Sequence, residues 1–482
     1  MKRKTYNSLA LLLLLLWSSE LCFAQPNTLY FMKGIPQTKD LNPARPGNSE
    51  GFYFSLPLLS KFEVEASTNN WSLNDLLHKG TGKADSTVMD LNNFITKIQD
   101  QNYIVESAAL TIFEAGYRKE KNTYAISFSQ RESGFASFDK NLIELAKSGN
   151  YKITGLTNYS GNLKYNAQHY RQIAFNYSHD LSKKITIGVA AKLLLGIGAE
   201  QSGNISLTTS PSLVGDSLNI TAIGRINIAL PPYMRSSATQ TTATDNINSP
   251  GAFIRSALNG FVSNYSNPGF AFDFGFAWRM SPKVELSMSV VDLGVIVWTK
   301  HLYLLDGNNR FLYQGPVQTS PGQDLTPWYL SSVNLLNKKI SKAMTLDLNH
   351  PGFSTRLPAK IYTGIDYQLT DAISLSGLSR MRIIDNTIRT SFTAGANTLI
   401  GDRWTISASY SVMESTLHSI GLAMGVKAGP AQFYAATDNV ISPLNPAKTS
   451  AITLRFGVNL LFGTPTSQIK GKVKNAFCNS KN

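Results

Sequence analysis

The most constraining feature of this sequence is a strict alternation between apolar residues and small or polar ones. It is clearest between residues 270 and 279, where aromatic residues occupy every even position and Ala, Asp, Gly or Arg every odd one. A second stretch, 452–462, carries an apolar residue at every even position. Because successive side chains of a β-strand point to opposite faces, this pattern predicts strands with one apolar and one polar face.

Soluble β-sandwiches alternate as well, but three features favour a barrel in a membrane. Many segments exceed the ~5–6 residues of soluble strands and match the ~9–11 residues that cross a bilayer at a tilt. Aromatic residues gather near segment ends, where interface girdles lie. Only 16% of the residues are charged, against about 25% in soluble domains. The predicted fold class is all-β: a transmembrane antiparallel β-barrel, which satisfies every strand edge in lipid.

The barrel is expected to have about 14 wall strands, within a range of roughly 12 to 16. The first two alternating segments are interpreted as part of a plug or entry element rather than as wall strands. Long insertions are expected at 70–101, 231–268 and 300–355, with short helices at 85–99, 139–147 and 251–262. The predicted strands span 52–60, 62–69, 103–118, 122–132, 168–182, 184–198, 217–230, 269–280, 283–298, 358–370, 372–384, 387–400, 403–413, 417–427, 430–437 and 449–462.

The N-terminus has the layout of a secretory signal peptide. Basic residues at positions 2–4 precede an apolar run from Leu9 to Trp17, and a small-residue cleavage site follows at Ala24. Lipid attachment at Cys22 is the alternative, although the residues before it make a poor lipidation motif. We expect a signal peptide at 1–24, a hatch-like plug at 25–50, a barrel at 51–463 and a basic tail at 464–482.

The formal net charge is +14. A basic balance can indicate a nucleic-acid partner, but here the cations are scattered and the chain is expected to reach the bacterial outer membrane. Contact with membrane lipid and anionic lipopolysaccharide is the expected use of this charge. No nucleic-acid partner is predicted, and the barrel is expected to be a monomer. The tail is interpreted as a solvated extension or as a periplasmic handle for a partner.

Short motifs resemble a known superfamily. The Asn-Pro-Ala motif at 42–44, the segment Ser289–Gly294 and the end of the last strand at 460–463 resemble FadL-like outer-membrane transporters. The likeness is greatest to PorV-like barrels and to barrels of unknown function of the Bacteroidota type. In FadL the N-terminal segment is a hatch inside the barrel, and hydrophobic substrates leave through a kink in the wall. The resemblance therefore implies that Asn42, Pro43 and Ala44 belong to a hatch. A tight turn at the barrel entry is the alternative, because Pro43 forces Asn42 out of the helical region.

Charged residues on the polar faces are expected to point into the lumen, since a charge facing the lipid midplane costs about 2–4 kcal/mol. Their mixed signs favour a paired, filled interior over a wide pore of one sign, with a substrate-lining role as the alternative. A slip of the apolar phase between Val290 and Leu293 predicts a β-bulge at Asp292 and Gly294. The expected lumen charges are Glu106, Glu114, Arg118, Lys192, Asp273, Arg279, Glu285, Asp366 and Arg455.

Motifs for catalysis, cofactor binding and metal binding are not found, so no enzyme activity, cofactor or metal is predicted. His418-Ser419 and the pair Asp347 and His350 are the local candidates for a barrel hydrolase. We rank three hypotheses. The first is FadL-like binding or passage of a hydrophobic small molecule, and the second is a PorV-like accessory role in secretion or surface assembly with a filled lumen. A barrel hydrolase is the third.

Overall fold

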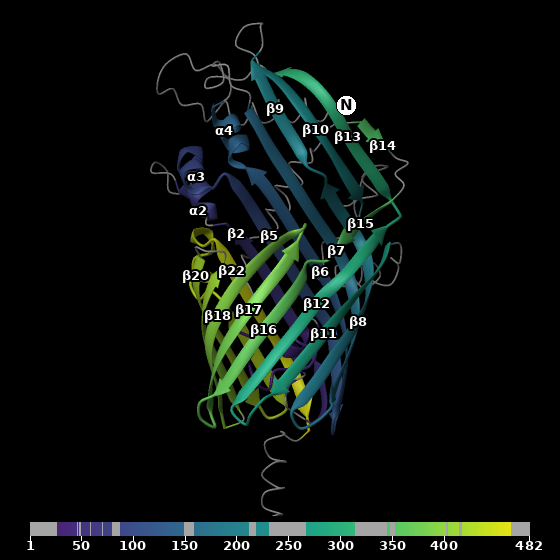
Figure 1. The fold of residues 1–482 in the computed structure, drawn as a ribbon, viewed down its shortest axis with the longest axis vertical. Helices are drawn as coiled ribbons and strands as arrows, with labels where there is room; N and C mark the ends of the chain where they lie inside the picture. Colours follow the sequence, from purple (N-terminus) through teal and green to yellow (C-terminus); the bar gives the residue numbers. More distant parts are fainter. Residues whose placement is uncertain are drawn as a thin grey trace, which may run out of the picture.

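The computed structural model shows an antiparallel β-barrel (Figure 1). It describes residues 27–45, 47, 50–57, 59–69, 71–79, 87–148, 159–211, 218–230, 267–313, 345–347, 352–401, 403–413 and 417–463. Short turns join the strands at the lower end in Figure 1, and β9, β10 and β13 rise highest at the other end. Because outer-membrane barrels keep short turns on the periplasmic side, the lower end is periplasmic.

The elements in chain order are mostly long strands. They are η1 Pro36–Asp40, β1 Gly51–Ser55, β2 Lys61–Thr68, α2 Leu73–Leu76, β3 Leu77–Lys79, β4 Thr87–Met89, α3 Leu91–Lys97, β5 Gln101–Lys119, β6 Asn122–Asp139, α4 Lys140–Ser148, β7 Tyr159–Asp180, β8 Ile185–Ser202, β9 Ile205–Pro211, β10 Leu218–Ala229, β11 Asn267–Arg279, β12 Val284–Trp298, β13 Leu302–Tyr313, β14 Thr345–Asp347, β15 Phe353–Arg356, β16 Ala359–Gln368, β17 Ile373–Ile384, β18 Thr387–Ile400, β19 Trp404–Met413, β20 Leu417–Ala428, β21 Ala431–Thr437, η3 Pro446–Lys448 and β22 Ala451–Phe462.

The wall is a closed ring of antiparallel ladders. Its order is β5, β6, β7, β8, β11, β12, β16, β17, β18, β19, β20, β21 and β22, and both β1 and β2 then pair β22 with β5. β15 continues β16 along β12 in the same register. Within the described residues, sixteen strands therefore fill fourteen wall positions.

The interpretation of the first two segments as an entry element is wrong, because β1 and β2 close the ring. They share one wall position, interrupted at 56–60, and each pairs with both β22 and β5. Without them the ring would leave two unpaired edges, which lipid does not tolerate. Their polar residues Ser55, Lys61, Glu63 and Glu65 are buried and face the filled lumen.

The segment 300–355, expected as a loop, also contains strands. β13 pairs with β10 along its whole length, from Leu302 opposite Ala229 to Tyr313 opposite Leu218. Together with β9 and β14 these strands extend one side of the barrel beyond the other side (Figure 1). The polar Asp306–Arg310 stretch interrupts the alternation, which is why the period did not reveal β13. The expected helix at 251–262 lies outside the described residues.

The outer surface of the wall is apolar, as the alternation requires. On β11 the outward side chains Phe270, Phe272 and Phe274 are 60%, 50% and 50% exposed, whereas the inward Ala271 and Asp273 are at most 1% exposed. Such a wall fits lipid outside and a packed interior. Among the described helices, none is long and apolar enough to span a membrane.

The lipid-facing wall predicts a stability effect that depends on depth. Phe274→Arg, near the middle of β11, should lower the free energy of unfolding by about 2–4 kcal/mol, because it places a charge at the bilayer midplane. Trp278→Arg, at the periplasmic end of the same face, should cost about 0–1 kcal/mol. Denaturant unfolding in lipid vesicles measures both, and equal losses would contradict lipid contact of this face.

Candidate functional site

Residues 27–45 lie inside the barrel, and we call this segment the plug. Thr28 contacts β19, where its Oγ1 lies 2.6 Å from Ser409 Oγ. At the periplasmic end, Lys33 Nζ donates to Gln368 Oε1 at 2.6 Å and Gln432 Nε2 donates to the Gly34 carbonyl at 2.8 Å. The plug therefore reaches several sides of the wall and fills the periplasmic part of the lumen.

The first part of the plug is apolar. Leu29, Tyr30, Phe31, Met32 and Ile35 are between 0% and 3% exposed. They form a cluster with inward wall side chains of β12, β16, β17, β20 and β21, namely Val291, Tyr362, Leu378, Ala423, Tyr434 and Ala436. The wall thus carries an apolar strip on its inner face, and the plug covers that strip.

A carboxylate holds the start of the plug. The backbone N–H groups of Asn27 and Thr28 donate to Asp438 Oδ2 and Oδ1 at 2.9 and 2.6 Å, and the Thr28 hydroxyl donates to the same Oδ1. Asp438 follows β21 directly and is 2% exposed. Two successive amides that share one carboxylate fix the direction of the chain as well as its position.

The Asn-Pro-Ala motif is a turn packed against the wall. Ala44 N–H donates to Asn42 Oδ1 at 2.9 Å, which closes an Asx-type turn around Pro43. Asn42 Nδ2 donates to Tyr30 Oη at 2.9 Å and to wall carbonyls of Phe276 and Met288 at 3.4 and 3.3 Å. A Cβ on Gly188 would overlap the Pro43 carbonyl, so glycine on the inner wall makes room for this turn.

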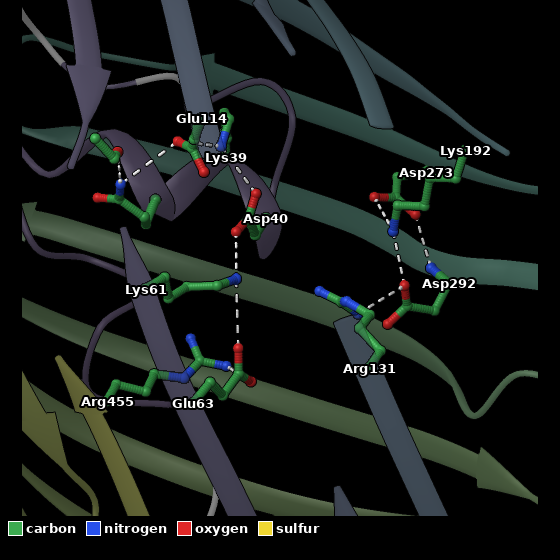
Figure 2. Close-up of polar contacts among 12 residues, drawn as sticks. Lys39, Asp40, Lys61, Glu63, Glu114, Arg131, Lys192, Asp273, Asp292 and Arg455 are labelled. Carbon is green, nitrogen blue, oxygen red and sulfur yellow. Dashed lines mark hydrogen bonds and ion pairs between the residues drawn. The ribbon is translucent and has the colours of Figure 1, made fainter. Parts of the chain in front are cut away.

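Ion pairs hold the second part of the plug (Figure 2). Lys39 Nζ lies 2.7 Å from Glu114 Oε1 on β5 and 3.0 Å from Asp40 Oδ1. Asp40 in turn pairs with Lys61 on β2, with Nζ 2.5 Å from Oδ2. Burial alone would raise the pKa of the Asp40 carboxyl, but Lys39 and Lys61 hold that pKa well below its ordinary value. Asp40 is therefore ionised, and the plug is tied electrostatically to two wall strands.

The same network continues into the wall. Lys61 lies 3.4 Å from Glu63 Oε2, and Glu63 pairs with Arg455 on β22 (Figure 2). Glu65, two residues further along β2, accepts from Arg380 at 3.2 Å and from Arg382 at 2.5 Å. Apart from Arg455, these wall charges were not among the expected lumen residues. Their alternation with Phe62 and Val64 is the sequence signal that marks Glu63 and Glu65 as inward.

A second network surrounds Asp292. Lys192 lies 2.6 Å and Arg131 3.6 Å from its carboxylate (Figure 2). Lys360 lies 3.0 Å from the same carboxylate. Lys192 also pairs with Asp273 at 2.6 Å, and Asp273 Oδ1 accepts the backbone N–H of Asp292 at 2.7 Å. The network joins strands β6, β8, β11, β12 and β16 across the lumen.

The backbone at Asp292 is irregular. Its φ is +62°, and the β11–β12 ladder shifts register between Phe272 and Phe274. A Cβ on Gly294 would overlap Ala271 on the neighbouring strand. The β11–β12 ladder nevertheless resumes at once, with Phe272 opposite Leu293 and Ala271 opposite Gly294. On the other side of β12, Leu357 N–H donates to the Gly294 carbonyl at 3.0 Å. The irregularity turns the Asp292 carboxylate inward, where it meets its three cations.

Other expected lumen charges lie at the periplasmic rim. Arg118 donates to Asp180 Oδ2 at 3.0 Å and to the Gly47 carbonyl at 3.2 Å. Glu285 pairs with Arg45 of the plug and lies opposite Asp366 on β16. Arg279 also contacts Glu285, at 3.4 Å, but its side chain is 56% exposed, so it lies at the rim and not within the lumen.

Glu106 does not face the lumen. The β5–β6 ladder shifts register between Thr111 and Phe113, so the residues above and below this bulge have opposite phases. Glu114 and Thr111 are inward and at most 2% exposed, which places Glu106 on the outer face with the exposed Phe113. Counting by twos from Glu114 across an unrecognised bulge gives the wrong face for Glu106.

The structure describes the residues proposed for a hydrolase site only in part. His350 and the side chain of His418 lie outside what the structure describes, and Ser419 is 5% exposed. In the described part of the chain, no group of three His, Cys, Asp or Glu residues is arranged to hold a metal ion.

A closed ring with an apolar outer face and its own N-terminal segment held inside defines a plugged outer-membrane β-barrel. Residues 44–438 match the family of unknown function DUF5723, and the chain belongs to this family. A comparison with curated proteins gives no match.

Solved structures with a similar arrangement include transporters. The Ralstonia pickettii toluene transporter TbuX is 11% identical, with 91% of this chain and 98% of that chain covered and a TM-score of 0.37. A FadL homologue of Pseudomonas aeruginosa is 9% identical, with 92% and 100% covered and a TM-score of 0.38. The translocator domain of the Neisseria meningitidis autotransporter NalP is 9% identical, with 86% and 90% covered and a TM-score of 0.29.

The glycine contact predicts that a single methyl group loosens the plug. Gly188→Ala should lower stability by about 1–3 kcal/mol, because the new Cβ overlaps the backbone of Pro43. It should also speed tryptic cleavage after Lys39, followed by mass spectrometry. Gly377→Ala, on the outer face with its nearest contact at 3.3 Å, is the matched control. Equal cleavage rates would show that Pro43 does not rest on Gly188.

The buried ion pair predicts non-additive energetics. Glu114→Gln should destabilise the barrel by about 3 kcal/mol, because Lys39 loses one of its two carboxylate partners inside the lumen. The double variant Lys39→Met with Glu114→Leu should recover most of that loss, since neither charge is then buried alone. Denaturant unfolding of the single and double variants measures the coupling. Additive losses would mean that the two side chains do not interact.

Proposed function

We propose that this barrel binds a hydrophobic small molecule and passes it through the lumen when the plug moves. The observation that carries the proposal is the apolar strip on the inner wall, formed by Val291, Tyr362, Leu378, Ala423, Tyr434 and Ala436. The interior of a water-filled barrel is polar, and an apolar strip there is unfavourable unless something apolar covers it. In this state the plug covers it.

The strip couples plug movement to an apolar guest. Exposing a large apolar side chain to water costs about 1.5–3 kcal/mol, and the plug buries several of them together with the strip. Water alone therefore disfavours displacement of the plug. A hydrophobic guest that replaces Leu29, Tyr30 and Phe31 against the strip offsets that cost, so it stabilises the displaced state by differential contact.

The polar part of the plug is easier to release than the apolar part. Lys39, Asp40 and Arg45 are held by ion pairs, and Gln37 by a hydrogen bond to Asn459 at 2.7 Å. Groups of this kind exchange their partners for water at a small net cost once water reaches them. We therefore infer that residues 36–40 move first and that the apolar residues, which include Leu41, follow when a guest is present.

A reversible lock on the plug tests this function. Thr28 and Ser409 approach closely through their side-chain oxygens, so Thr28→Cys with Ser409→Cys should form a disulfide, in a Cys478→Ser background. The readout is entry of an apolar fluorescent dye through the outer membrane of cells that carry the barrel. We expect oxidation to reduce barrel-dependent entry at least tenfold and reduction to restore it.

Each single-cysteine variant is the matched control, because neither can form the bridge. Equal dye entry in the oxidised and reduced double variant would contradict gating by the plug. No barrel-dependent entry in any form would contradict passage itself.

A second candidate is an accessory role in secretion or surface assembly. The observation that favours it is the ion-paired interior, in which Glu63, Glu65 and Asp292 each meet at least one cation of another strand. A barrel that never conducts can use such pairs as permanent braces. Absence of dye entry in every form, together with a loss of surface-exported protein in cells lacking the barrel, is the outcome that this role predicts.

A further inference from the structure

The hairpin of β17 and β18 ends in a tight turn at the extracellular side. Ile384 is the last residue of β17 and Thr387 the first of β18, so only Asp385 and Asn386 form the loop. Both have positive φ, +50° and +64°, which Asp and Asn tolerate better than other non-glycine residues. The hairpin ends far below the tops of β9, β10 and β13 (Figure 1). A short, rigid tip therefore lies beside a much taller wall.

The tip is not exposed above the barrel, because it contacts the inner face of distant strands. Ile384 is 4% exposed and packs in a cluster with Val105 of β5 and Phe135 of β6, against which Tyr103 also packs. Asp385 Oδ2 lies 2.5 Å from Lys164 Nζ on β7. The Arg389 guanidinium lies 3.2 Å from the centre of the Tyr103 ring.

These contacts cross the whole lumen. Five wall positions separate β6 from β17 in one direction around the ring, and five separate β5 from β18 in the other. The hairpin thus contacts the strands diametrically opposite to it. Lys164 and Val105 are inward residues of those strands, since they share the phase of the buried Gln168 and Ala109. The tip therefore lies across the interior of the barrel.

We propose that the β17–β18 tip is an extracellular lid, which closes the lumen by latching onto β5, β6 and β7 and opens by swinging away from them. The lid is separate from the plug, which lies nearer the periplasm and makes none of these contacts. The barrel then has two closures in series, one formed by the N-terminal segment and one by a hairpin of the wall.

The contacts of the tip with the opposite strands are few and partly exposed to water, so the tip can separate from those strands. Only one apolar side chain of the loop region, Ile384, is inserted, while Ile383 and Ile388 on the same hairpin are 37% and 63% exposed on the outer face. The ion pair to Lys164 is partly wet, with side chains 35% and 24% exposed. Withdrawal of the tip beyond Ile383 thus breaks one apolar insertion, one partly wet ion pair and the contact of Arg389 with Tyr103. The β16–β17 ladder, which runs as far as Ile383 opposite Ala359, stays paired.

Cysteine labelling from outside the cell tests the lid without requiring any solute to pass. Ala109 is an inward residue of β5, four positions below Val105, and it lies opposite Glu63 on the plug side of the tip. Ala109→Cys, in a Cys478→Ser background, is labelled on intact cells with a charged, membrane-impermeant thiosulfonate. We expect Ile384→Ala to speed this labelling at least tenfold and Asp385→Asn to speed it severalfold.

Matched controls lie on the same elements. Ile388→Ala removes the same side chain from the outer face of the hairpin, and Arg225→Gln breaks an exposed ion pair with Asp306, 2.8 Å long, elsewhere on the extracellular extension. Neither should change the labelling rate. Heat-modifiable gel migration confirms that each variant is a folded barrel. If Ile384→Ala does not fold, Asp385→Asn still tests the lid, because it preserves the shape of the turn.

Equal labelling rates in all four variants would overturn the lid. So would labelling of Ala109→Cys, with no other change in the tip, that is as fast as labelling of a cysteine on the outer rim. Neither outcome bears on the plug, because the labelled residue is on the extracellular side of it. Conversely, loss of dye passage in the locked plug leaves the lid result unchanged. The two closures are therefore tested independently.

Discussion

The structure depends on one constraint: a closed sheet in lipid must keep charged side chains off the part of its outer face that lipid covers. The outward positions of β11, β12 and β17–β19 are taken mostly by apolar residues and by no charged ones, so the charges of these strands share a narrow interior. An isolated charge there would be costly, so each inward charge needs a partner, as it would in a folded core. The N-terminal segment enters this balance directly, because Lys39 and Asp40 supply partners to Glu114 and Lys61.

The lumen is consequently layered along its axis. The plug lies at the periplasmic end and covers the apolar strip of the wall. Above it, the pairs around Asp292 and Glu63 connect neighbouring parts of the wall, and the pair of Glu65 with Arg382 connects β2 with β17 across the ring. The hairpin tip with Ile384 forms the outermost layer. The plug and the tip each combine apolar packing with ion pairs, whereas the middle layer is held by ion pairs.

The sequence predicted the fold class well because the alternation has a physical cause at every wall strand. The same period also predicted the general position of the strands, and the mixed signs of the charges on the polar faces favoured a paired interior. It failed where the period breaks locally. The bulge between Thr111 and Phe113 reverses the phase and misplaces Glu106, and the polar run within β13 hides a strand.

Pairing partners are a different kind of information, which a single sequence does not carry. Glu65 meets Arg380 and Arg382 because β2 and β17 face each other across the ring. The lid contact of Asp385 with Lys164 depends on the same global geometry. By contrast, the Asx-type turn at Asn42 is local, and the order Asn-Pro-Ala already contains it.

The position of Asp438 has a consequence for assembly. It binds the amides of Asn27 and Thr28 across 411 and 410 residues of sequence, and Asn459 binds Gln37 across 422. These contacts join residues near the two ends of the sequence, so Asn27, Thr28 and Gln37 cannot meet their partners until the last strands have been made. Contacts of such high sequence separation form late in folding. β22, which carries Asn459, also pairs with β1 and β2. The last step of assembly therefore both closes the barrel and binds the N-terminal segment inside it.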